Sequence, residues 1–221
     1  MNRLIVSASL LCLVCSTLTA ADEPQWERLF DGKTLEGWEG NTQVFRVEDG
    51  AITAGNMKDK IARNEFLTHK RELADFELKL TFKLLGKGSN AGIQIRSRRI
   101  PNHHEMIGYQ ADMGQGWWGC LYDESRRRKV LAKAPPELAK VLRADDWNEY
   151  LIRCEGKRVR LWINGLQTVD YTEADDKIEQ KGLIGLQIHG GPPSQVWYKD
   201  IEIRVPPGPA PKGPTKPAGQ D

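Results

Sequence analysis

Polar side chains recur at every second position in several short segments, opposite to apolar residues. In one such segment Gln110 and Asp112 alternate with Tyr109 and Ala111. Because side chains alternate between the two faces of a β-strand, each segment would turn an apolar face to the core and a polar face outward. The outward set comprises Asn90, Gly92, Gln94 and Arg96; Gln110 and Asp112; Arg160 and Trp162; and Gly185, Gln187 and His189.

These residue types suit a saccharide ligand. Amides and carboxylates bind neighbouring hydroxyls, a guanidinium donates to two acceptors at once, and an indole stacks on the C–H face of a pyranose. We therefore expect a sugar-binding face on the concave side of one sheet, with substrate-binding residues Asn90, Gln94, Gln110, Trp162 and Gln187. The loop with Trp117 and Trp118 is an alternative source of the stacking platform. A scatter of solvated polar residues is the other interpretation of the same pattern.

Several familiar catalytic signatures are missing from the sequence. It contains no Gly-x-Ser-x-Gly, no glycine-rich loop ending in Lys-Ser or Lys-Thr, and no His-Glu-x-x-His. It also lacks a strand with two alternating carboxylates, which many sandwich glycosidases use as nucleophile and acid. The run His103-His104-Glu105 resembles a metal cluster, but neighbouring residues of an extended loop point in different directions. We therefore expect only weak metal binding there and no ordinary two-carboxylate hydrolase.

The elements that must position the polar face are strands. In residues 76–84 every second position is Phe or Leu, and the positions between them carry Glu, Lys or Thr. Asn164-Gly165 predicts a tight hairpin turn, because both residues tolerate positive φ. Short helices are expected only at 71–74 and 136–142. Further strands are expected at 44–47, 91–98, 107–113, 119–122, 147–155, 158–163, 183–189 and 195–205.

About ten strands with so little helix predict an all-β jelly-roll sandwich of two antiparallel sheets. The composition agrees, because 21 glycines and 7 tryptophans suit a turn-rich β protein. The 32 basic and 30 acidic residues leave a net charge of only +2, which provides no surplus to neutralise a phosphate backbone. The one basic run, 126–129, follows two acidic residues and is typical of a solvated turn. We therefore expect no nucleic-acid partner.

Both ends of the chain differ in composition from its middle. Residues 1–21 have the charged, apolar and small-residue layout of a secretory signal peptide, too short for a stable membrane span. Its removal predicts an exported protein, periplasmic or extracellular. Residues 206–221 form a proline-rich tail that cannot pair in a sheet, which leaves a folded domain over 25–205. The mature chain keeps Cys120 and Cys154, which could form a disulfide or be two small core residues.

Five motifs in order resemble those of the 3-keto-disaccharide hydrolase family. They run from about residue 29 to 203, over nearly the whole expected domain. The motifs are Leu-Phe-Asp-Gly-Lys-Thr-Leu-Glu-Gly-Trp at 29–38, Asn-Ala-Gly-Ile-Gln-Ile-Arg at 90–96, Gly-Tyr-Gln-Ala-Asp at 108–112, Trp-Asn-Glu-Tyr at 147–150 with Trp-Ile-Asn-Gly at 162–165, and Gly-Leu-Ile-Gly-Leu-Gln-Ile-His-Gly at 182–190.

The resemblance implies a concanavalin A-like jelly roll that acts as a 3-keto-glucoside 1,2-lyase or a 3-keto-2-hydroxyglucal hydratase. A ketone at C3 acidifies the C2 hydrogen, so one base can remove it while the C1 substituent leaves, and water can then add. Such chemistry needs a base, an acid for the leaving oxygen and a group that polarises the ketone. It does not need two opposed carboxylates.

On this reading four residues would be catalytic. His189 is the first choice for base or acid, because a free imidazole exchanges protons near neutral pH. Asp112 is either the base or the group that orients His189, Arg96 would steady the enolate oxygen, and Glu124 is a weaker candidate acid. His189 as a turn-end residue and Asp112 as a turn former are the structural alternatives. A divalent metal is a candidate cofactor, with Asp112, Gln110 and His189 as its ligands.

One departure from the family bears on activity. Gln110 stands where many relatives have Glu, which removes a candidate base, and Ala91 replaces a more usual Ser. A lectin-like module that binds saccharides without converting them is therefore the alternative function. A structural envelope protein whose concave face binds other proteins is a third.

Overall fold

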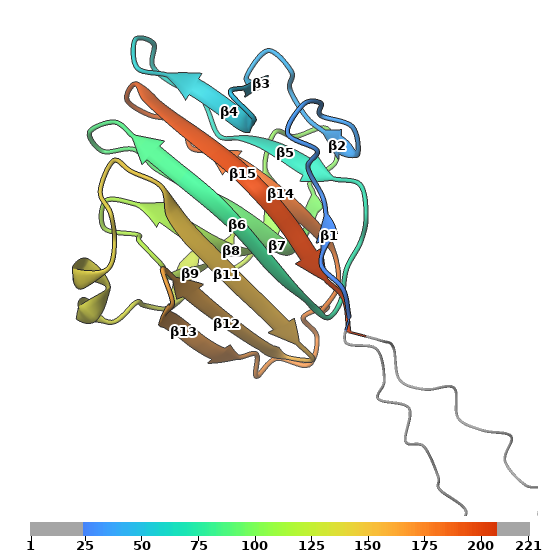
Figure 1. The fold of residues 1–221 in the computed structure, drawn as a ribbon. Coiled ribbons are helices and arrows are strands. Elements are labelled where there is room, and N and C mark those ends of the chain that lie inside the picture. Colours follow the sequence, from blue (N-terminus) through green and yellow to red (C-terminus); the bar gives the residue numbers. More distant parts are fainter. Residues whose placement is uncertain (1–23, 207–221) are drawn as a thin grey trace, which may run out of the picture.

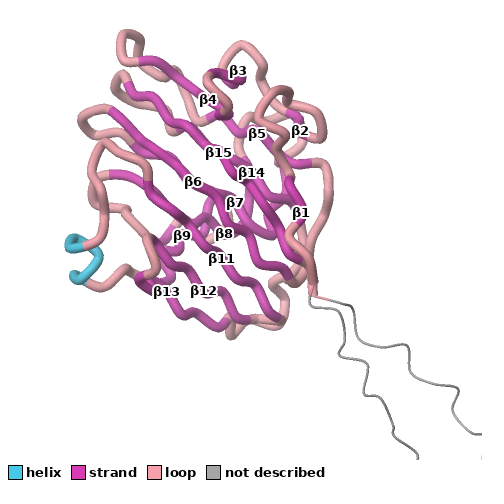
Figure 2. Tube along the Cα trace, viewed as in Figure 1, coloured by secondary structure: helices cyan, strands magenta, loops and turns pink. Residues whose placement is uncertain are grey.

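The computed structural model describes residues 24–206 of the 221-residue chain. The expected signal peptide at 1–21 lies outside the described residues, and so does the tail from residue 207 onward. In the described part, fifteen strands and one short 3₁₀ helix, η1 (Pro136–Lys140), form the fold. Figure 2 shows how strongly strand predominates over helix.

Two antiparallel sheets lie one behind the other, with the eight-stranded sheet in front in Figure 1. In order across it, that sheet contains β13 (Leu166–Thr172), β12 (Arg158–Ile163), β11 (Asn148–Glu155), β6 (Phe76–Leu85), β15 (Ser194–Arg204), β4 (Ala51–Asn56) and β3 (Phe45–Glu48), while β1 (Glu27–Arg28) pairs with β15. The seven-stranded sheet contains β10 (Lys129–Ala132), β9 (Leu121–Glu124), β8 (Met106–Gly114), β7 (Asn90–Arg99), β14 (Leu183–Ile188), β5 (Glu65–His69) and β2 (Trp38–Glu39). Strands that are adjacent in a sheet but far apart in the sequence, such as β7 and β14, are typical of a jelly roll. The predicted jelly-roll sandwich is thereby confirmed.

The core lies between the two sheets and follows the alternation of the sequence. Phe76, Leu78, Leu80, Phe82 and Leu84 of β6 are all buried there. From the other sheet, the inward faces of β7, β8 and β14 meet them with Ala, Ile, Leu, Tyr and Met side chains. Burial of these apolar surfaces is the main stabilising contribution to the fold. The same alternation leaves the polar positions of β7, β8 and β14 on the opposite face of their sheet.

The hairpin between β12 and β13 is formed as expected. Asn164 and Gly165 have φ values of 49° and 80°, and Ile163 pairs with Leu166 across the turn. The helix expected at 71–74 is wrong, because Leu73 instead forms an isolated antiparallel bridge with Gly182. Its amide donates to the Gly182 carbonyl at 2.8 Å, and a return hydrogen bond of 3.0 Å completes the pair.

Cys120 and Cys154 are free, buried thiols. Cys154 packs in the core on β11, whereas Cys120 lies just before β9 in the other sheet. The structure therefore agrees with the interpretation as two small buried residues and not with a disulfide. Burial raises the pKa of the Cys154 thiol to about 12.

Candidate functional site

A cavity of about 350 Å³ lies on the outward face of the seven-stranded sheet; we call it the cleft. Five of the nine predicted site residues line it: Asn90, Gln110, Asp112, Glu124 and His189. They come from β7, β8, β9 and the end of β14, which are consecutive neighbours in this sheet. Alternation therefore identified most of the polar lining, and strand order brings it together.

The register of the strands explains how the floor of the cleft is formed. Gly92 on β7 pairs with Asp112 on β8 and with Gln187 on β14. Asp112 and Gln187 therefore lie on either side of this glycine. A Cβ atom at Gly92 would lie only 2.7 Å from the Gln110 side chain. Because glycine leaves this space open, Gln110 can lie across β7. A residue with any side chain at position 92 would displace it.

Gln110 is the centre of a chain of side-chain hydrogen bonds beneath the cleft. Its Nε2 donates to Asp112 Oδ1 at 2.6 Å and to Gln187 Oε1 at 3.2 Å. Its Oε1 accepts from Gln94 Nε2, and Gln94 Oε1 accepts from the Ser97 hydroxyl at 2.6 Å. These contacts fix the amide orientation of Gln110 with its donor toward Asp112. Gln94 and Gln187 are fully buried, so both support the cleft from below and do not line it.

Asp112 has an unusual environment for a carboxyl group. It is only 2% exposed, and its second oxygen, Oδ2, accepts from the Cys120 thiol at 3.6 Å. Burial raises the pKa of Asp112 to about 7 against the opposing effect of the hydrogen bonds from Gln110 and Cys120, and the negative charge of Glu124 adds to the rise. This carboxyl can therefore both release and accept a proton near neutral pH.

Glu124 is a second carboxyl of the same kind. It is half-buried, and its Oε1 accepts from the Ser125 amide at 3.2 Å. Burial raises the pKa of Glu124, and the negative charge of Glu105 raises it further. The cleft therefore holds two carboxyl groups whose environments both favour the protonated form.

His189 lies exposed at the rim of the cleft. Its amide donates to the Asn90 carbonyl at 3.1 Å, and its Nδ1 lies 2.6 Å from the Gly190 carbonyl oxygen. Because a carbonyl only accepts, Nδ1 must carry the hydrogen, which leaves Nε2 as the atom available to a ligand. Gly190, and not Asp112, therefore orients the imidazole.

Two of the predicted residues lie elsewhere. A bulge between Ile95 and Arg98, with Arg96 at a φ of 48°, breaks the alternation at the end of β7. The Arg96 guanidinium is fully buried and donates to the carbonyls of Ala74 and Gly156 at 2.6 Å, to Gln180 at 2.8 Å and to Asp75 at 2.9 Å. The structure thus assigns Arg96 to the packing of this end of the sandwich, and the expected contact with an enolate is wrong.

Trp162 is the other misplaced residue. It lies on β12 in the eight-stranded sheet, 5.8 Å from the guanidinium carbons of Arg153 and Arg160. The alternative platform, Trp117, lines the cleft, is 40% exposed and meets the Tyr122 ring edge-on at 5.7 Å. The local pattern of β12 was correct, but sequence alone did not show that β12 belongs to the other sheet.

Two further polar side chains, those of Asn64 and Tyr122, line the cleft and were not predicted from the sequence. Tyr122 has the same parity as Glu124 and could have been found by alternation, since the residues of the other parity, Leu121 and Asp123, face the interior. Asn64 lies in a loop without alternation. Its Oδ1 accepts from the Gly190 amide at 2.8 Å and its Nδ2 donates to Glu105 at 3.0 Å, so it ties this loop to the rim.

The expected metal ligands do not form a metal site. Within residues 24–206 there is no group of three or more His, Cys, Asp or Glu side chains that could hold a metal ion. Both oxygens of Asp112 already accept hydrogen bonds, and Gln110 turns its nitrogen toward Asp112. In the His103-His104 run, the two rings stack on each other with centroids 4.5 Å apart. The donor set therefore does not fit a divalent cation.

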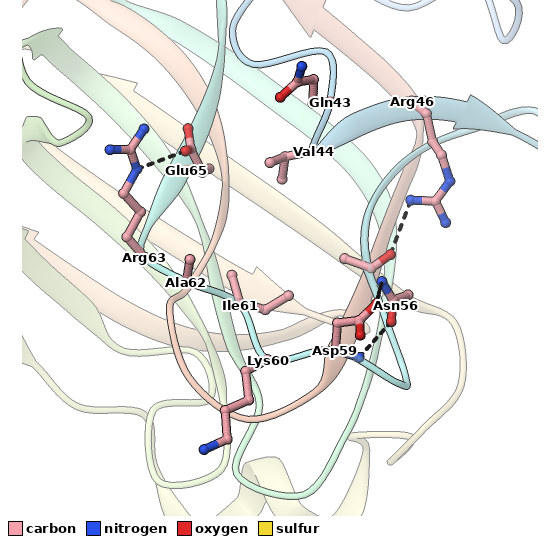
Figure 3. A pocket seen from close by; sticks show the side chains of 11 residues that line it. Gln43, Val44, Arg46, Asn56, Asp59, Lys60, Ile61, Ala62, Arg63 and Glu65 are labelled. Atoms are coloured by element: carbon pink, nitrogen blue, oxygen red, sulfur yellow. Dashed lines mark hydrogen bonds and ion pairs between the residues drawn. The ribbon is translucent and has the colours of Figure 1, made fainter.

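A second cavity, of about 270 Å³, lies beside the loop of residues 59–65 (Figure 3). Its arginines are held by neighbouring groups: Arg63 pairs with Glu65 at 3.0 Å, and Arg46 donates to the Gly55 carbonyl at 3.1 Å (Figure 3). None of the predicted site residues lines it. The cleft, with its unpaired carboxyl groups, is therefore the candidate site.

An antiparallel jelly roll of two sheets, with an amide- and carboxyl-lined cleft on the outer face of one of them, is a concanavalin A-like fold. The chain belongs to the 3-keto-alpha-glucoside-1,2-lyase-like domain family, whose model matches residues 25–204. The family expected from the five motifs is thereby confirmed.

Solved structures with the same fold include a "putative glycosyl hydrolase" from Parabacteroides distasonis, with a TM-score of 0.63 and 19% identity, covering 82% of this chain and 94% of that one. A carbohydrate-binding module from Bacillus subtilis gives a TM-score of 0.60 at 11% identity, covering 76% and 96%. The exoplasmic/lumenal domain of VIP36, in its Ca²⁺/Man3GlcNAc-bound form, gives 0.58 at 11%, covering 81% and 88%. These likenesses confirm the concanavalin A-like fold.

No curated protein matches the chain. In the described part of the chain, no helix is both long and apolar enough to cross a membrane.

Proposed function

We propose that the protein is an exported enzyme that cleaves 3-keto-glycosides by removing the C2 proton, eliminating the C1 substituent and then adding water. The observation that carries this proposal is the Asp112 carboxyl group, buried at the floor of a polar cleft with a pKa of about 7. Membership of the 3-keto-alpha-glucoside-1,2-lyase-like family supports the same chemistry.

In the first step, ionised Asp112 takes the proton from C2. The electron pair of that C–H bond forms the C1=C2 double bond as the C1–O bond breaks, and the leaving oxygen takes up a proton relayed from solvent through Glu124, the second carboxyl group of the cleft. The products are the free alcohol and an unsaturated 3-keto sugar. Addition of water across C1=C2, with its oxygen bonding to C1 and a proton returning to C2, yields the free 3-keto sugar.

Charge that develops on the ketone oxygen needs hydrogen-bond donors, and Arg96 is not available to supply them. The Asn90 amide and the Tyr122 hydroxyl line the same cleft and can donate. We assign these two residues to the ketone and His189 Nε2, at the rim, to a sugar hydroxyl. The exposed Trp117 indole supplies the stacking surface.

Gln110 fits this mechanism as a donor to the base. A carboxylate at position 110 could not donate to Asp112, whereas the amide does so at 2.6 Å. The hydrogen bond stabilises ionised Asp112 and so limits the rise in its pKa. The change from Glu to Gln thus moves the role of base to Asp112 and is compatible with turnover.

The decisive experiment uses a 3-keto-disaccharide carrying deuterium at C2. We expect purified protein to release reducing sugar several-fold more slowly from this substrate than from the protiated one, because C2–H cleavage is part of the reaction. Asp112→Asn should lower release by about 1000-fold, whereas Trp162→Ala, a surface change on the other sheet, should leave it unchanged. Release at equal rates from both substrates, without exchange of C2 hydrogen with solvent, would exclude the proposed step.

A carbohydrate-binding role without catalysis is the second candidate. It is supported by the amide-rich lining and by the fold shared with a carbohydrate-binding module. Calorimetry with an unoxidised disaccharide and its 3-keto form separates the two functions. Tight binding of the unoxidised sugar, with no release of reducing sugar from the 3-keto form, would favour the binding module.

Export is proposed from the composition of residues 1–21. Fractionation of expressing cells should recover a protein shortened by about two kilodaltons outside the cytoplasm, as expected for loss of about twenty residues. Full-length protein in the cytoplasmic fraction would contradict it.

A further inference from the structure

The outer face of the eight-stranded sheet, turned toward the viewer in Figure 1, carries four tryptophans among basic residues. Seven pairs of a Lys or Arg cation with a Trp ring lie on it, with distances to the ring centroid of 4.2 to 5.8 Å. Energetically significant pairs of this kind occur roughly once per 70–80 residues in proteins, so the density here is unusual. The four rings are those of Trp26, Trp147, Trp162 and Trp197.

One part of this face differs from the rest; we call it the Lys-Trp patch and define it as Lys83, Trp147, Trp197 and Lys199. The Lys83 ammonium lies 5.0 Å from the Trp147 ring and 4.5 Å from the Trp197 ring, and the Lys199 ammonium lies 4.2 Å from the Trp147 ring. All four side chains are half-buried, so each remains accessible. Trp197 and Lys83 are direct neighbours across β15 and β6.

The charges of the patch are not neutralised. Within residues 24–206, neither the Lys83 nor the Lys199 ammonium has a carboxylate within ion-pair distance. Elsewhere on the face the cations near tryptophans are paired: Lys79 with Glu202 at 2.7 Å, Arg153 with Glu77, and Arg160 with Glu155. The patch is thus the part of the face where two indoles meet two unpaired cations.

We propose that the Lys-Trp patch is a second saccharide-binding surface, separate from the cleft and specific for acidic polysaccharides. An indole stacks on the C–H face of a pyranose, and an ammonium binds the carboxylate of a uronic acid. An exposed cation–π contact is weak, so a ligand carboxylate can draw the lysine away and free the ring face. The two sheets place the patch and the cleft on opposite faces of the sandwich.

Polygalacturonate is the probe, with uncharged dextran and a single-stranded oligonucleotide as comparison ligands. We expect the protein to bind polygalacturonate at low salt, to bind dextran at least tenfold more weakly, and to lose affinity as salt rises. The double variant Lys83→Gln with Lys199→Gln should weaken binding of polygalacturonate about tenfold. Trp147→Ala should weaken it similarly, and Trp147→Phe less.

The controls change the paired cations and the cleft. Lys79→Gln removes a cation that Glu202 neutralises, and Trp162→Ala removes a ring whose neighbouring arginines are both paired with carboxylates. Both variants should leave polygalacturonate affinity unchanged. Asp112→Asn should also leave it unchanged, so failure of the reaction in the cleft does not affect this test. Equal binding by the double lysine variant, absence of binding at low salt, or equal affinity for the oligonucleotide would each overturn the proposal.

Discussion

Two groups of carboxylates in this molecule differ in their partners: one is paired with arginines and the other lines the cleft, and β9 carries a member of each. On β9, Asp123 faces the interior and Glu124 faces the cleft. Asp123 accepts hydrogen bonds from Arg126 at 2.9 and 3.1 Å and also from Arg127. Glu124 has no cation partner among the described residues. Two adjacent positions on this strand therefore carry a carboxylate paired with arginines and a carboxylate without a cation partner.

Glu173, in the paired group, and Asp112, in the cleft, show how these partners change the carboxyl pKa. Burial would raise the pKa of Glu173, but hydrogen bonds from Arg127, Tyr109 and Tyr171 outweigh it and lower the value to about 2. For Asp112, where only an amide and a thiol donate, burial dominates and the pKa rises to about 7. Paired carboxylates between the sheets thus stabilise the fold, whereas those in the cleft keep protons exchangeable.

Asp112→Asn should produce the largest effect. It removes the base but keeps a group of the same shape, so the release of reducing sugar should fall by about 1000-fold.

The same variant should also stabilise the fold above pH 7 by on the order of 3 kcal/mol, because ionised Asp112 is costly to bury. The raised pKa means that the folded state binds the extra proton between about pH 4 and 7, so stability falls as pH rises through that window.

Comparison of the melting temperatures of this variant and the parent at several pH values checks the prediction. The melting temperature of the variant should exceed that of the parent by its full amount at pH 8, and the two should be equal below pH 4. A variant that is less stable than the parent at pH 8 would contradict the environment described for Asp112.

Glu173→Gln should have the opposite effects: it should destabilise the fold and leave turnover intact. It leaves Arg127 without its bidentate partner, so unfolding should become easier by about 3 kcal/mol at pH 7, while turnover by the folded protein is preserved. Because the pKa of Glu173 is lowered, its contribution is present above pH 4.5 and is lost as pH falls toward 2. Urea unfolding at pH 7 and pH 3 measures this. A loss of turnover with unchanged stability would refute the division into two groups.

Gly92→Ala should weaken ligand affinity by about tenfold, since the added methyl group displaces Gln110 from its contact with Asp112. Calorimetry with a 3-keto-disaccharide checks it. The double variant Gly92→Ala with Gln110→Ala removes the colliding side chain and should recover stability but not affinity. Recovery of both would show that Gln110 has no part in the site.

Trp117→Ala gives the smallest expected effect, about a fivefold loss of saccharide affinity in the cleft. Trp162→Ala is the matched control and should leave that affinity unchanged, because Trp162 lies on the other sheet. Equal losses in the two variants would contradict the assignment of Trp117 as the stacking platform.

The sequence predicted the local features of the fold well, because alternation is a property of each strand. It identified the polar faces of β7, β8 and β14, the Asn164-Gly165 hairpin and the family. It did not detect the bulge that turns Arg96 inward, since a bulge depends on how two strands pair. Nor could it place Trp162, because sheet membership is set by tertiary pairing. Short strands such as β5 and β10 were missed because they have few residues in which to show a period.

The proton-exchanging role of Asp112 is tested most directly by carbon-detected NMR titration of the aspartate carboxyl groups. We expect one Asp resonance to titrate near pH 7 and to be absent from the Asp112→Asn spectrum. A resonance that disappears in this variant but titrates near pH 4 or below would show that Asp112 is an ordinary carboxylate. The cleft would then lack the base on which the proposed reaction depends.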